Sequence, residues 1–421
     1  MPIPLVASAF EEGLSRIPHV YTILKTLPWL GGIYALKRYF AGASNTSDRN
    51  MHSKVVMITG GTSGIGAVVA RELATRGAQL VLLTQQSLTD PFLVDFILDL
   101  REDTKNELIN AEHVDLASLH SIRLFATKWI DNAPPRRLDM VILCASTLTP
   151  AGGSAITTED GVETNWGVNY MANFQLLSIL SPAIRAQPAD RDVRIIFGMC
   201  SSYMGGSLTH LAKANPGKNE KARKQNSQEV YFTPSGAYAT SKFALFTFAQ
   251  AFQKHLSIYK RPDKLPMTAK VMTVDPGFVR TPGMRRYLSF GSLWGLLVYL
   301  IMWPLWWLIL KSPEQGAQSF LFAAMEGALR EGDGGDMIKE CKIVKILRKE
   351  VNDEGLQQAL WQESEKTVQA LEKIGATKRA TEKKTKEEMD AREKAEKELA
   401  EEKAKAPPEK QPGSRRSKKK A

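Results

Sequence analysis

The sequence predicts an α/β fold in which helices cover both faces of a mostly parallel β-sheet, a doubly wound arrangement. Between residue 54 and about residue 346, short β-branched runs alternate with amphipathic helical stretches at the spacing typical of βαβ units. The first such run, VVMITG, leads directly into the glycine-rich stretch TGGTSGIG and then into a helical pattern. Parallel strands need crossover helices, so both faces of this sheet are expected to be buried.

Each expected strand is a short apolar run bounded by turn or polar residues. The runs are VVMITG (55–60), QLVLLT (79–84), DMVILCAS (139–146), VRIIFGMCSS (193–202) and AKVMTVDPG (269–277), with a last strand near GGDMIK (334–339). These strands and their helices define a predicted α/β domain over residues 51–346. An apolar segment, residues 1–50, precedes it, and a charged segment, residues 347–421, follows it.

Composition limits the possible functions. A chain of 421 residues with a hydrophobic fraction of 43% can bury one large core and carry extensions. The formal net charge is +11, but no helix-turn-helix, zinc-finger or RNA-binding signature accompanies it, so we expect no nucleic-acid partner. The three cysteines have no paired spacing, which is typical of a reduced cytosolic setting, and the six histidines form no metal-binding pattern.

The glycine-rich stretch is the first feature that points to a ligand. Glycine at 60, 64 and 66 permits a tight turn, a close approach of backbone N–H groups to a pyrophosphate, and close packing of the helix on the strand. A tight turn without a ligand would show similar glycines. The order of strand, turn and helix around them favours dinucleotide binding.

The spacing Gly-x-x-x-Gly-x-Gly resembles that of the short-chain dehydrogenase/reductase family. Other motifs match in the same order: Asp115 in HVDLASLHS, Asn169 in WGVNYMANF, the serines of CSS, the YATSK pattern, and the loop VDPGFVRTP. The resemblance covers about residues 53–345. It is greatest to the retinol-dehydrogenase-like branch with its fungal lipid-associated members, and it implies a Rossmann fold.

The resemblance assigns a role to each catalytic candidate. Tyr238 would donate a proton to a carbonyl or take one from an alcohol while a hydride moves to or from the nicotinamide. Lys242 lies one helical turn away, where its ammonium would lower the pKa of the phenol and hold the nicotinamide ribose. Ser202, rather than Ser201, would hydrogen-bond the substrate oxygen, and Asn169 would position a water in the proton relay.

The resemblance also implies a set of cofactor-binding residues at the strand ends. These are Thr59, Gly60, Ser63, Gly64, Ile65, Gly66, Thr84, Asp115, Tyr238, Lys242, Pro276, Gly277, Val279 and Thr281. The second strand ends at Thr84 and Gln85, without the carboxylate that would bond a ribose 2′-hydroxyl and repel a 2′-phosphate. We therefore predict NADP(H), with NAD(H) as the alternative; the family's phosphate-binding Arg or Lys is also missing.

The end of the expected strand DMVILCAS (139–146) departs from the family pattern. The family has Asn-Asn-Ala-Gly there, whereas this chain has Leu143, Cys144, Ala145 and Ser146. We expect backbone groups or water to replace the two amides. Cys144 and Cys200 end strands that would be neighbours, either as a redox-sensitive pair or, as we favour, as two small buried thiols.

Residues 1–50 and the stretch SLWGLLVYLIMWPLWWLILKSPE (292–314) are unusually apolar. The first is interpreted as interfacial helices with Lys37 and Arg38 at headgroup level, or equally as a helix on the protein's own surface. The second lies within the substrate region, residues 283–312. One membrane crossing there would separate the last strand from its own sheet, so a crossing is excluded. Tryptophans favour the membrane–water interface, so docking into one leaflet is favoured over an internal lid or a dimer interface.

Two polar segments complete the chain. Residues 203–237 separate Ser202 from Tyr238, and their stretch LAKANPGKNEKARKQNSQ (211–228) is expected to form a polar, basic excursion. The Glu/Lys/Ala-rich stretch after about residue 353 is expected to form a solvated helix followed by a disordered tail. The final residues KKKA match a dilysine retrieval signal, a short match in a lysine-rich tail.

The sequence as a whole predicts an oxidoreductase that interconverts a hydrophobic alcohol and its aldehyde or ketone, of the retinoid, steroid or lipid class. The alternative is a catalytically weak dehydrogenase-fold scaffold that senses redox state at a lipid surface. The expected partners are a hydrophobic small molecule, a membrane or lipid-droplet surface and possibly a second copy of the chain. The expected location is the cytosolic face of the endoplasmic reticulum or a lipid droplet, with the mitochondrial outer membrane or the cytoplasm as alternatives.

Overall fold

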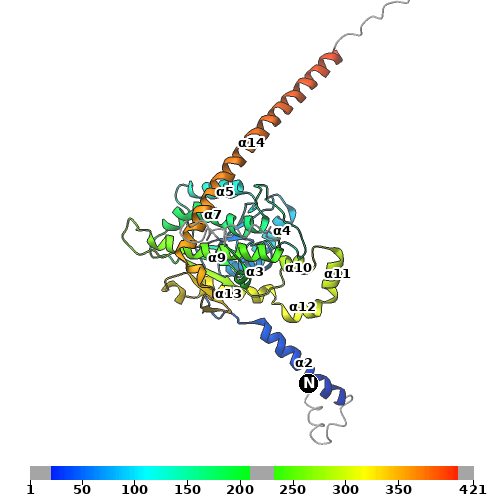
Figure 1. Cartoon of the computed structure of the whole chain (residues 1–421), viewed down its shortest axis with the longest axis vertical. Coiled ribbons are helices and arrows are strands. Elements are labelled where there is room, and N and C mark those ends of the chain that lie inside the picture. Colours follow the sequence, from blue (N-terminus) through cyan, green and yellow to red (C-terminus); the bar gives the residue numbers. More distant parts are fainter. Residues whose placement is uncertain (1–19, 209–231, 406–421) are drawn as a thin grey trace, which may run out of the picture. The chain divides into compact units, whose positions relative to one another are not determined.

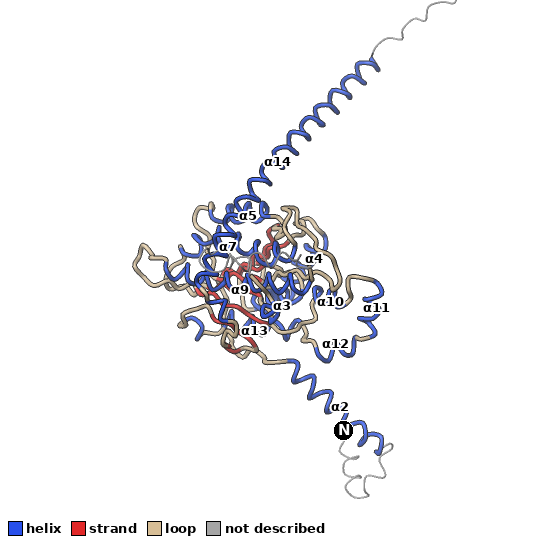
Figure 2. Tube along the Cα trace, in the orientation of Figure 1, coloured by secondary structure: helices blue, strands red, loops and turns tan. Residues whose placement is uncertain are grey.

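The computed structural model of the chain describes residues 20–208 and 232–405. One eight-stranded sheet forms the centre of the first compact unit, which ends at Val368, and Figures 1 and 2 show its strands enclosed by helices. The strands are β1 Val55–Thr59, β2 Gln79–Thr84, β3 Ile109–His113, β4 Met140–Leu143, β5 Arg194–Gly198, β6 Lys270–Asp275, β7 Asp336–Lys339 and β8 Lys342–Val344. Their order is β3-β2-β1-β4-β5-β6-β7-β8, and only β8 runs antiparallel to its neighbour.

Alternate side chains of the strands face two different helical layers. Ile196 of β5 belongs to a core shared with Val69 of α3 and Phe320 of α13, whereas the next residue, Phe197, has its ring 6.1 Å from that of Phe248 on α9. Helices α3, α4 and α13 therefore cover one face. Helix α9 covers the other face and packs with α7, which packs in turn with α5. The bounds of these helices are α3 Gly64–Thr75, α4 Pro91–Thr104, α5 Leu119–Ile130, α7 Ala172–Arg185, α9 Pro234–Ile258 and α13 Pro313–Met325.

The doubly wound parallel sheet expected from the sequence is confirmed. Every predicted strand is present, and two further strands, β3 and β8, lie at the two edges of the sheet. The INAEH sequence of β3 mixes polar and apolar residues and only Ile109 is buried, so this strand carries no apolar run that a pattern could reveal. The strand order reverses between β1 and β4, and the crevice at such a switch point is where open α/β sheets bind ligands.

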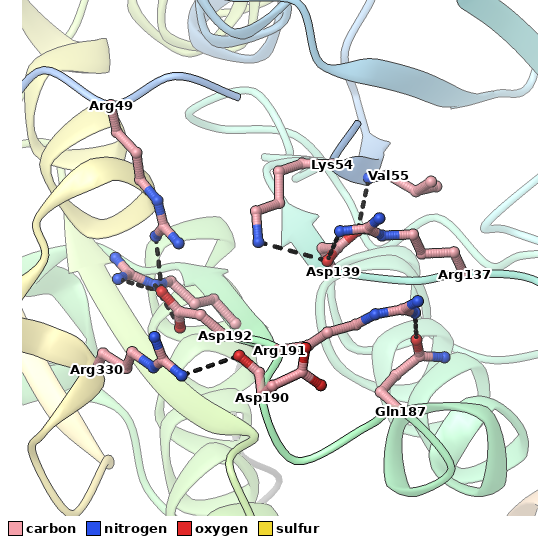
Figure 3. Close-up of polar contacts among 11 residues, drawn as sticks. Arg49, Lys54, Val55, Arg137, Asp139, Gln187, Asp190, Arg191, Asp192 and Arg330 are labelled. Atoms are coloured by element: carbon pink, nitrogen blue, oxygen red, sulfur yellow. Dashed lines mark hydrogen bonds and ion pairs between the residues drawn. The ribbon is translucent and has the colours of Figure 1, made fainter. Parts of the chain in front are cut away.

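Buried ion pairs hold the opposite, amino-terminal end of the sheet. The fully buried carboxylate of Asp139 accepts from the Val55 amide at 2.8 Å and from Arg137 at 2.6 and 2.9 Å (Figure 3). Arg194 is also fully buried: it pairs with Asp192 at 2.7 Å and donates to the Ala323 and Glu326 carbonyls at the end of α13. These contacts fix α13 on the sheet.

The remaining elements are short apart from the two terminal helices. They are α2 Val20–Ala41, α6 Thr164–Trp166, the π-helix η2 Gly167–Met171, the 3-10 helices η3 Ser201–Gly205, η5 Ala328–Arg330 and η6 Lys349–Asn352, then α10 Pro282–Leu288, α11 Leu293–Ile301, α12 Trp303–Ile309 and α14 Glu354–Lys405. The polar excursion, like the dilysine match, falls mainly outside the described residues. Across the described ranges, none of the helices has both the length and the apolar character that crossing a membrane requires.

The start of α14 packs on α7 and α9 within the first unit. The indole of Trp361 lies 5.6 Å from the rings of both Phe174 and Phe248, and the Ser364 hydroxyl contacts the buried Tyr170 hydroxyl at 2.5 Å. The compact unit therefore continues to Val368, beyond the boundary expected at residue 346. From Gln369 to Lys405, α14 is a charged helix, as expected, with i,i+4 ion pairs such as Lys378 with Glu382.

Candidate active site

The glycine turn after β1 has the geometry of a phosphate cradle. Gly60 and Gly64 have positive φ angles of 67° and 56°, and a Cβ on Gly66 would lie 2.2 Å from the Gly60 carbonyl oxygen. Helix α3 begins at Gly64, and its N-cap residue, Ser63, makes no side-chain capping bond. The first N–H groups of α3 thus have no side-chain cap, which fits an anion at this helix end.

The loop after β6 closes over this turn. Gly277 has a φ of 80° and donates its N–H to Asp275 at 2.9 Å. Thr281 caps α10 by accepting from the Met284 amide, and a Cβ on Gly64 would lie 3.4 Å from the Thr281 methyl group. The two loops that the sequence assigns to the cofactor are therefore adjacent across the sheet's switch point.

The other predicted cofactor residues lie at the same edge. The buried Thr59 accepts from the Ala145 amide at 3.2 Å, and Thr84 at the end of β2 accepts from the Gln86 amide at 3.2 Å. Asp115, just after β3, accepts from the Ala117 amide at 2.8 Å, so part of its carboxylate is engaged in a local turn. The site as a whole fits a dinucleotide laid along the carboxyl ends of the strands.

Helix α9 brings Tyr238 and Lys242 to the same edge. The two residues are one turn apart, and the Lys242 ammonium lies 5.7 Å from the centre of the Tyr238 ring. Lys242 is only 2% exposed and donates to the carbonyl of Gly198 at the end of β5 at 2.9 Å. A Cβ on Gly198 would lie 2.8 Å from the Leu143 carbonyl oxygen, so β4 and β5 approach each other closely beside the Lys242 ammonium.

The side chains of Cys200 and Ser146 contact the Tyr238 hydroxyl. The Cys200 thiol donates to it at 3.6 Å and lies 2.6 Å from the Ser202 hydroxyl, and the Ser146 side chain also hydrogen-bonds the phenol. Ser201 points elsewhere, with its hydroxyl 2.5 Å from Asp275. The Cys200 thiol thus links Ser202, and not Ser201, to the Tyr238 hydroxyl, while sequence reasoning missed Ser146 and Cys200 as neighbours of the phenol.

Burial dominates the acid–base behaviour of the two α9 residues. It raises the pKa of Tyr238 well above its ordinary value, with a further increase from the neighbouring Cys200, and it lowers the pKa of Lys242. The net shift of the Tyr238 pKa is upward because desolvation is the largest effect, and the lowering contribution expected from Lys242 stays a prediction. At neutral pH the phenol carries its proton and can donate it.

Asn169 is fully buried in the π-helix η2 and ties three parts of the site together. Its side-chain oxygen accepts from the Thr147 amide at 2.8 Å and from the Ser146 hydroxyl at 3.2 Å, and its amide nitrogen donates to Ser241 at 3.1 Å. Ser241 in turn donates to the Tyr238 carbonyl at 2.8 Å. All these contacts are with protein groups, so Asn169 positions the loop after β4 against α9; π-turns of this kind recur at functional sites.

The two cysteines near the site differ in environment. Burial raises the pKa of the Cys144 thiol to about 12, which keeps it protonated and unreactive at neutral pH. All three cysteines are free thiols. The geometry supports the interpretation of Cys144 as a space-filling thiol, and it places Cys200 beside the predicted catalytic hydroxyls.

Comparison with known proteins agrees with this geometry. The family model for the short chain dehydrogenases matches residues 54–205. An uncharacterised oxidoreductase of Schizosaccharomyces pombe, pbr1, is 41% identical over 89% of this chain and 97% of its own length. Human retinol dehydrogenase 13 is 30% identical over 80% and 91%, and mouse polyprenol dehydrogenase is 32% identical over 74% and 82%.

A solved structure extends the likeness to the fold. A crystal structure of an uncharacterised protein from Mycobacterium paratuberculosis has a TM-score of 0.51 at 20% sequence identity and covers 78% of this chain and 98% of its own. With the dinucleotide cradle and the Tyr238–Lys242 pair at the switch point of the sheet, the chain belongs to the short-chain dehydrogenase/reductase family of oxidoreductases, in its retinol-dehydrogenase-like branch.

Proposed function

We propose that this oxidoreductase transfers a hydride between NADP(H) and a hydrophobic alcohol–carbonyl pair of the retinoid, steroid or lipid class, at a membrane or lipid-droplet surface. The observation that carries the proposal is the meeting of the Tyr238, Ser202 and Cys200 side chains next to the glycine turn. The names of two relatives, a retinol and a polyprenol dehydrogenase, support an apolar substrate.

The chain's own residues would act on the proton. The reduced dinucleotide supplies the hydride, and Ser202 donates a hydrogen bond to the substrate carbonyl oxygen and polarises it. Tyr238, which burial keeps protonated, delivers its proton to the same oxygen as the charge develops. Lys242, anchored by the Gly198 carbonyl, would hold the ribose. The protonated phenol is the form that carbonyl reduction requires, and we propose the reaction in this direction.

The preference for NADP(H) rests on the end of β2. Thr84 and the adjacent Gln85 offer no carboxylate to repel a 2′-phosphate, and the Thr84 hydroxyl is held by the Gln86 amide. The glycine turn supplies the N–H groups that would face the pyrophosphate. The ratio of kcat/KM for NADPH and NADH measures this preference, and equal values would overturn it.

A panel assay tests the proposal as a whole. We expect NADPH oxidation with retinoid, steroid and long-chain aldehydes or ketones in the presence of lipid vesicles, and little with short polar carbonyls. Tight dinucleotide binding without turnover on any of them would favour the alternative, a redox-sensing scaffold. For location, a tagged full chain would be followed with markers of the endoplasmic reticulum, lipid droplets and mitochondria.

A further inference from the structure

Helices α2, α11 and α12 expose an unusually apolar surface, here called the α2–α12 surface. Only Gly295 and Tyr299 are buried within α11, and no residue of α12 is buried. Its most exposed large side chains are Leu293 at 86%, Trp294 at 79%, Tyr39 at 79% and Trp29 at 75%. Such a surface in a folded chain marks an interaction site, and side chains this exposed do not form an internal lid.

Basic side chains hold α2 and the loop after β6 against α12. The Lys37 ammonium of α2 donates to the Trp307 and Leu310 carbonyls at the end of α12 and lies 5.0 Å from the centre of the Trp307 ring. Arg280, in the loop after β6, lies 5.1 Å from the centre of the Trp303 ring. Figure 1 shows α12 between α11 and α2 at one side of the domain.

The surface carries charge of one sign only. Residues 20–41 and 278–310 contain no aspartate or glutamate. They contain six basic residues: Lys25, Lys37, Arg38, Arg280, Arg285 and Arg286. Within the described ranges, no ion pair includes any of the six. Burial and the nearby Arg280 also lower the pKa of Lys37. Glu314, just beyond these ranges, has its pKa lowered by the Ser312 side chain and, to a smaller extent, by the charge of Arg280.

We propose that the α2–α12 surface docks on a leaflet rich in anionic phospholipids, with its tryptophans at the headgroup boundary and its basic residues on the lipid phosphates. This inference rests on the proposed function and deepens it, because it names the lipid class. A second copy of the chain is a poorer occupant, since a symmetric contact would bring two sets of like charges together without an acid between them. A neutral lipid surface would leave the cations without partners.

The docking surface is connected to the reaction site. Lys311, directly after α12, bonds through its backbone to Phe278 and Arg280 of the loop after β6 at 2.9 Å, and its ammonium pairs with Glu340. Glu340 also accepts from the Ala43 amide just after α2 at 2.8 Å. Docking of this surface would therefore hold the loop after β6, which carries predicted cofactor residues, close to the leaflet.

The test is co-sedimentation of the full chain with vesicles, without substrate or dinucleotide. Vesicles of phosphatidylcholine alone are compared with vesicles that also contain phosphatidylserine. We expect binding to the anionic vesicles only. The triple variant Arg38→Gln, Arg285→Gln, Arg286→Gln should bind them on the order of 100-fold more weakly, at roughly fivefold per residue. Trp294→Ser should weaken binding while keeping the preference for the anionic vesicles.

A matched control removes three charges from the distal part of α14: Lys378→Gln, Lys383→Gln, Lys384→Gln. This variant should bind as the unmodified chain does; if it alone loses binding, the tail holds the lipid and the proposal is wrong. Equal binding to both vesicle types, or a stable dimer that the surface triple dissolves, would also overturn it. Circular dichroism checks the fold of each variant. If anionic binding holds while the carbonyl panel fails, the proposed activity falls and the docking stands.

Discussion

Replacing Tyr238 by phenylalanine removes one oxygen atom from the centre of the site. The hydroxyl's contacts are a thiol at 3.6 Å and the Ser146 side chain, so the folded chain loses little; we expect its free energy of unfolding to change by less than about 1 kcal/mol. The reaction loses its proton donor. General acid catalysis contributes roughly 10²- to 10⁴-fold, so kcat should fall by that factor, about 3–5 kcal/mol of barrier.

The assay compares NADPH-dependent reduction of a hydrophobic aldehyde, dinucleotide affinity and thermal unfolding in the same preparations. Tyr259→Phe, at the end of the same helix and under the Arg185 guanidinium, is the matched control and should leave all three unchanged. A Tyr238→Phe chain that keeps its turnover would refute the assignment of the proton donor. One that loses dinucleotide binding would show that the phenol is needed for binding rather than for chemistry.

The raised pKa of Tyr238 gives a second test on the dinucleotide-free chain. Because burial raises the folded-state pKa, the stability from this group is present below the unfolded pKa, about 10, and is lost as pH rises toward the folded value. The phenolate absorbance that separates the chain from Tyr238→Phe should thus emerge only above about pH 10. A phenolate signal near neutrality would contradict the dominance of burial.

Three further outcomes are expected. Thr84→Asp should shift the kcat/KM ratio from NADPH toward NADH by about 10- to 100-fold, and an unchanged ratio would show that β2 does not contact the ribose. Gly66→Ala places a Cβ 2.2 Å from the Gly60 carbonyl and should abolish dinucleotide binding, measured by calorimetry. Arg194→Leu leaves the buried Asp192 with Arg49 as its remaining cation and removes the donors to the Ala323 and Glu326 carbonyls. It should lower the free energy of unfolding by about 3–5 kcal/mol, whereas the double change with Asp192→Leu should recover part of it. Burial favours protonated Asp192, but the bonds and charges of Arg194 and Arg49 outweigh it and lower the pKa; the stability from this group should therefore be lost in urea titrations as pH falls through that lowered value.

The fold could be predicted largely because its strands are buried on both faces. β1 and β4 are buried at every position, so their sequences are continuous apolar runs that stand out from the helical patterns. Edge strands lack this signal: β3 buries only Ile109, and β8 has three residues. The pairing of Lys242 with Tyr238 could also be predicted. The two residues are one helical turn apart in the sequence, and this spacing alone places both side chains on the same side of α9.

The supporting contacts could not be predicted, because they join segments far apart in the chain. Leu360, Trp361 and Val368 make the first turns of α14 more apolar than its remainder, but they do not show which surface they cover. The aromatic face on α7 and α9 that receives the indole is formed only by folding. The placement of Lys37 against α12 is likewise set by tertiary structure. The local sequence pattern predicts which face of a helix is apolar, but it does not predict which part of the protein covers that face.

The altered end of β4 bears most directly on the choice between an enzyme and a redox-sensing scaffold. The amides absent from this strand would have satisfied backbone groups, and the chain satisfies them otherwise: the Thr59 hydroxyl accepts from Ala145, and the Asn169 side chain accepts from Thr147. Ser146, where the family has glycine, hydrogen-bonds the Tyr238 phenol and donates to the Asn169 side chain. An inactive scaffold has no need of a hydrogen-bonded path from the π-helix to the proton donor. The departure from the family pattern therefore favours a rebuilt active site over a lost one.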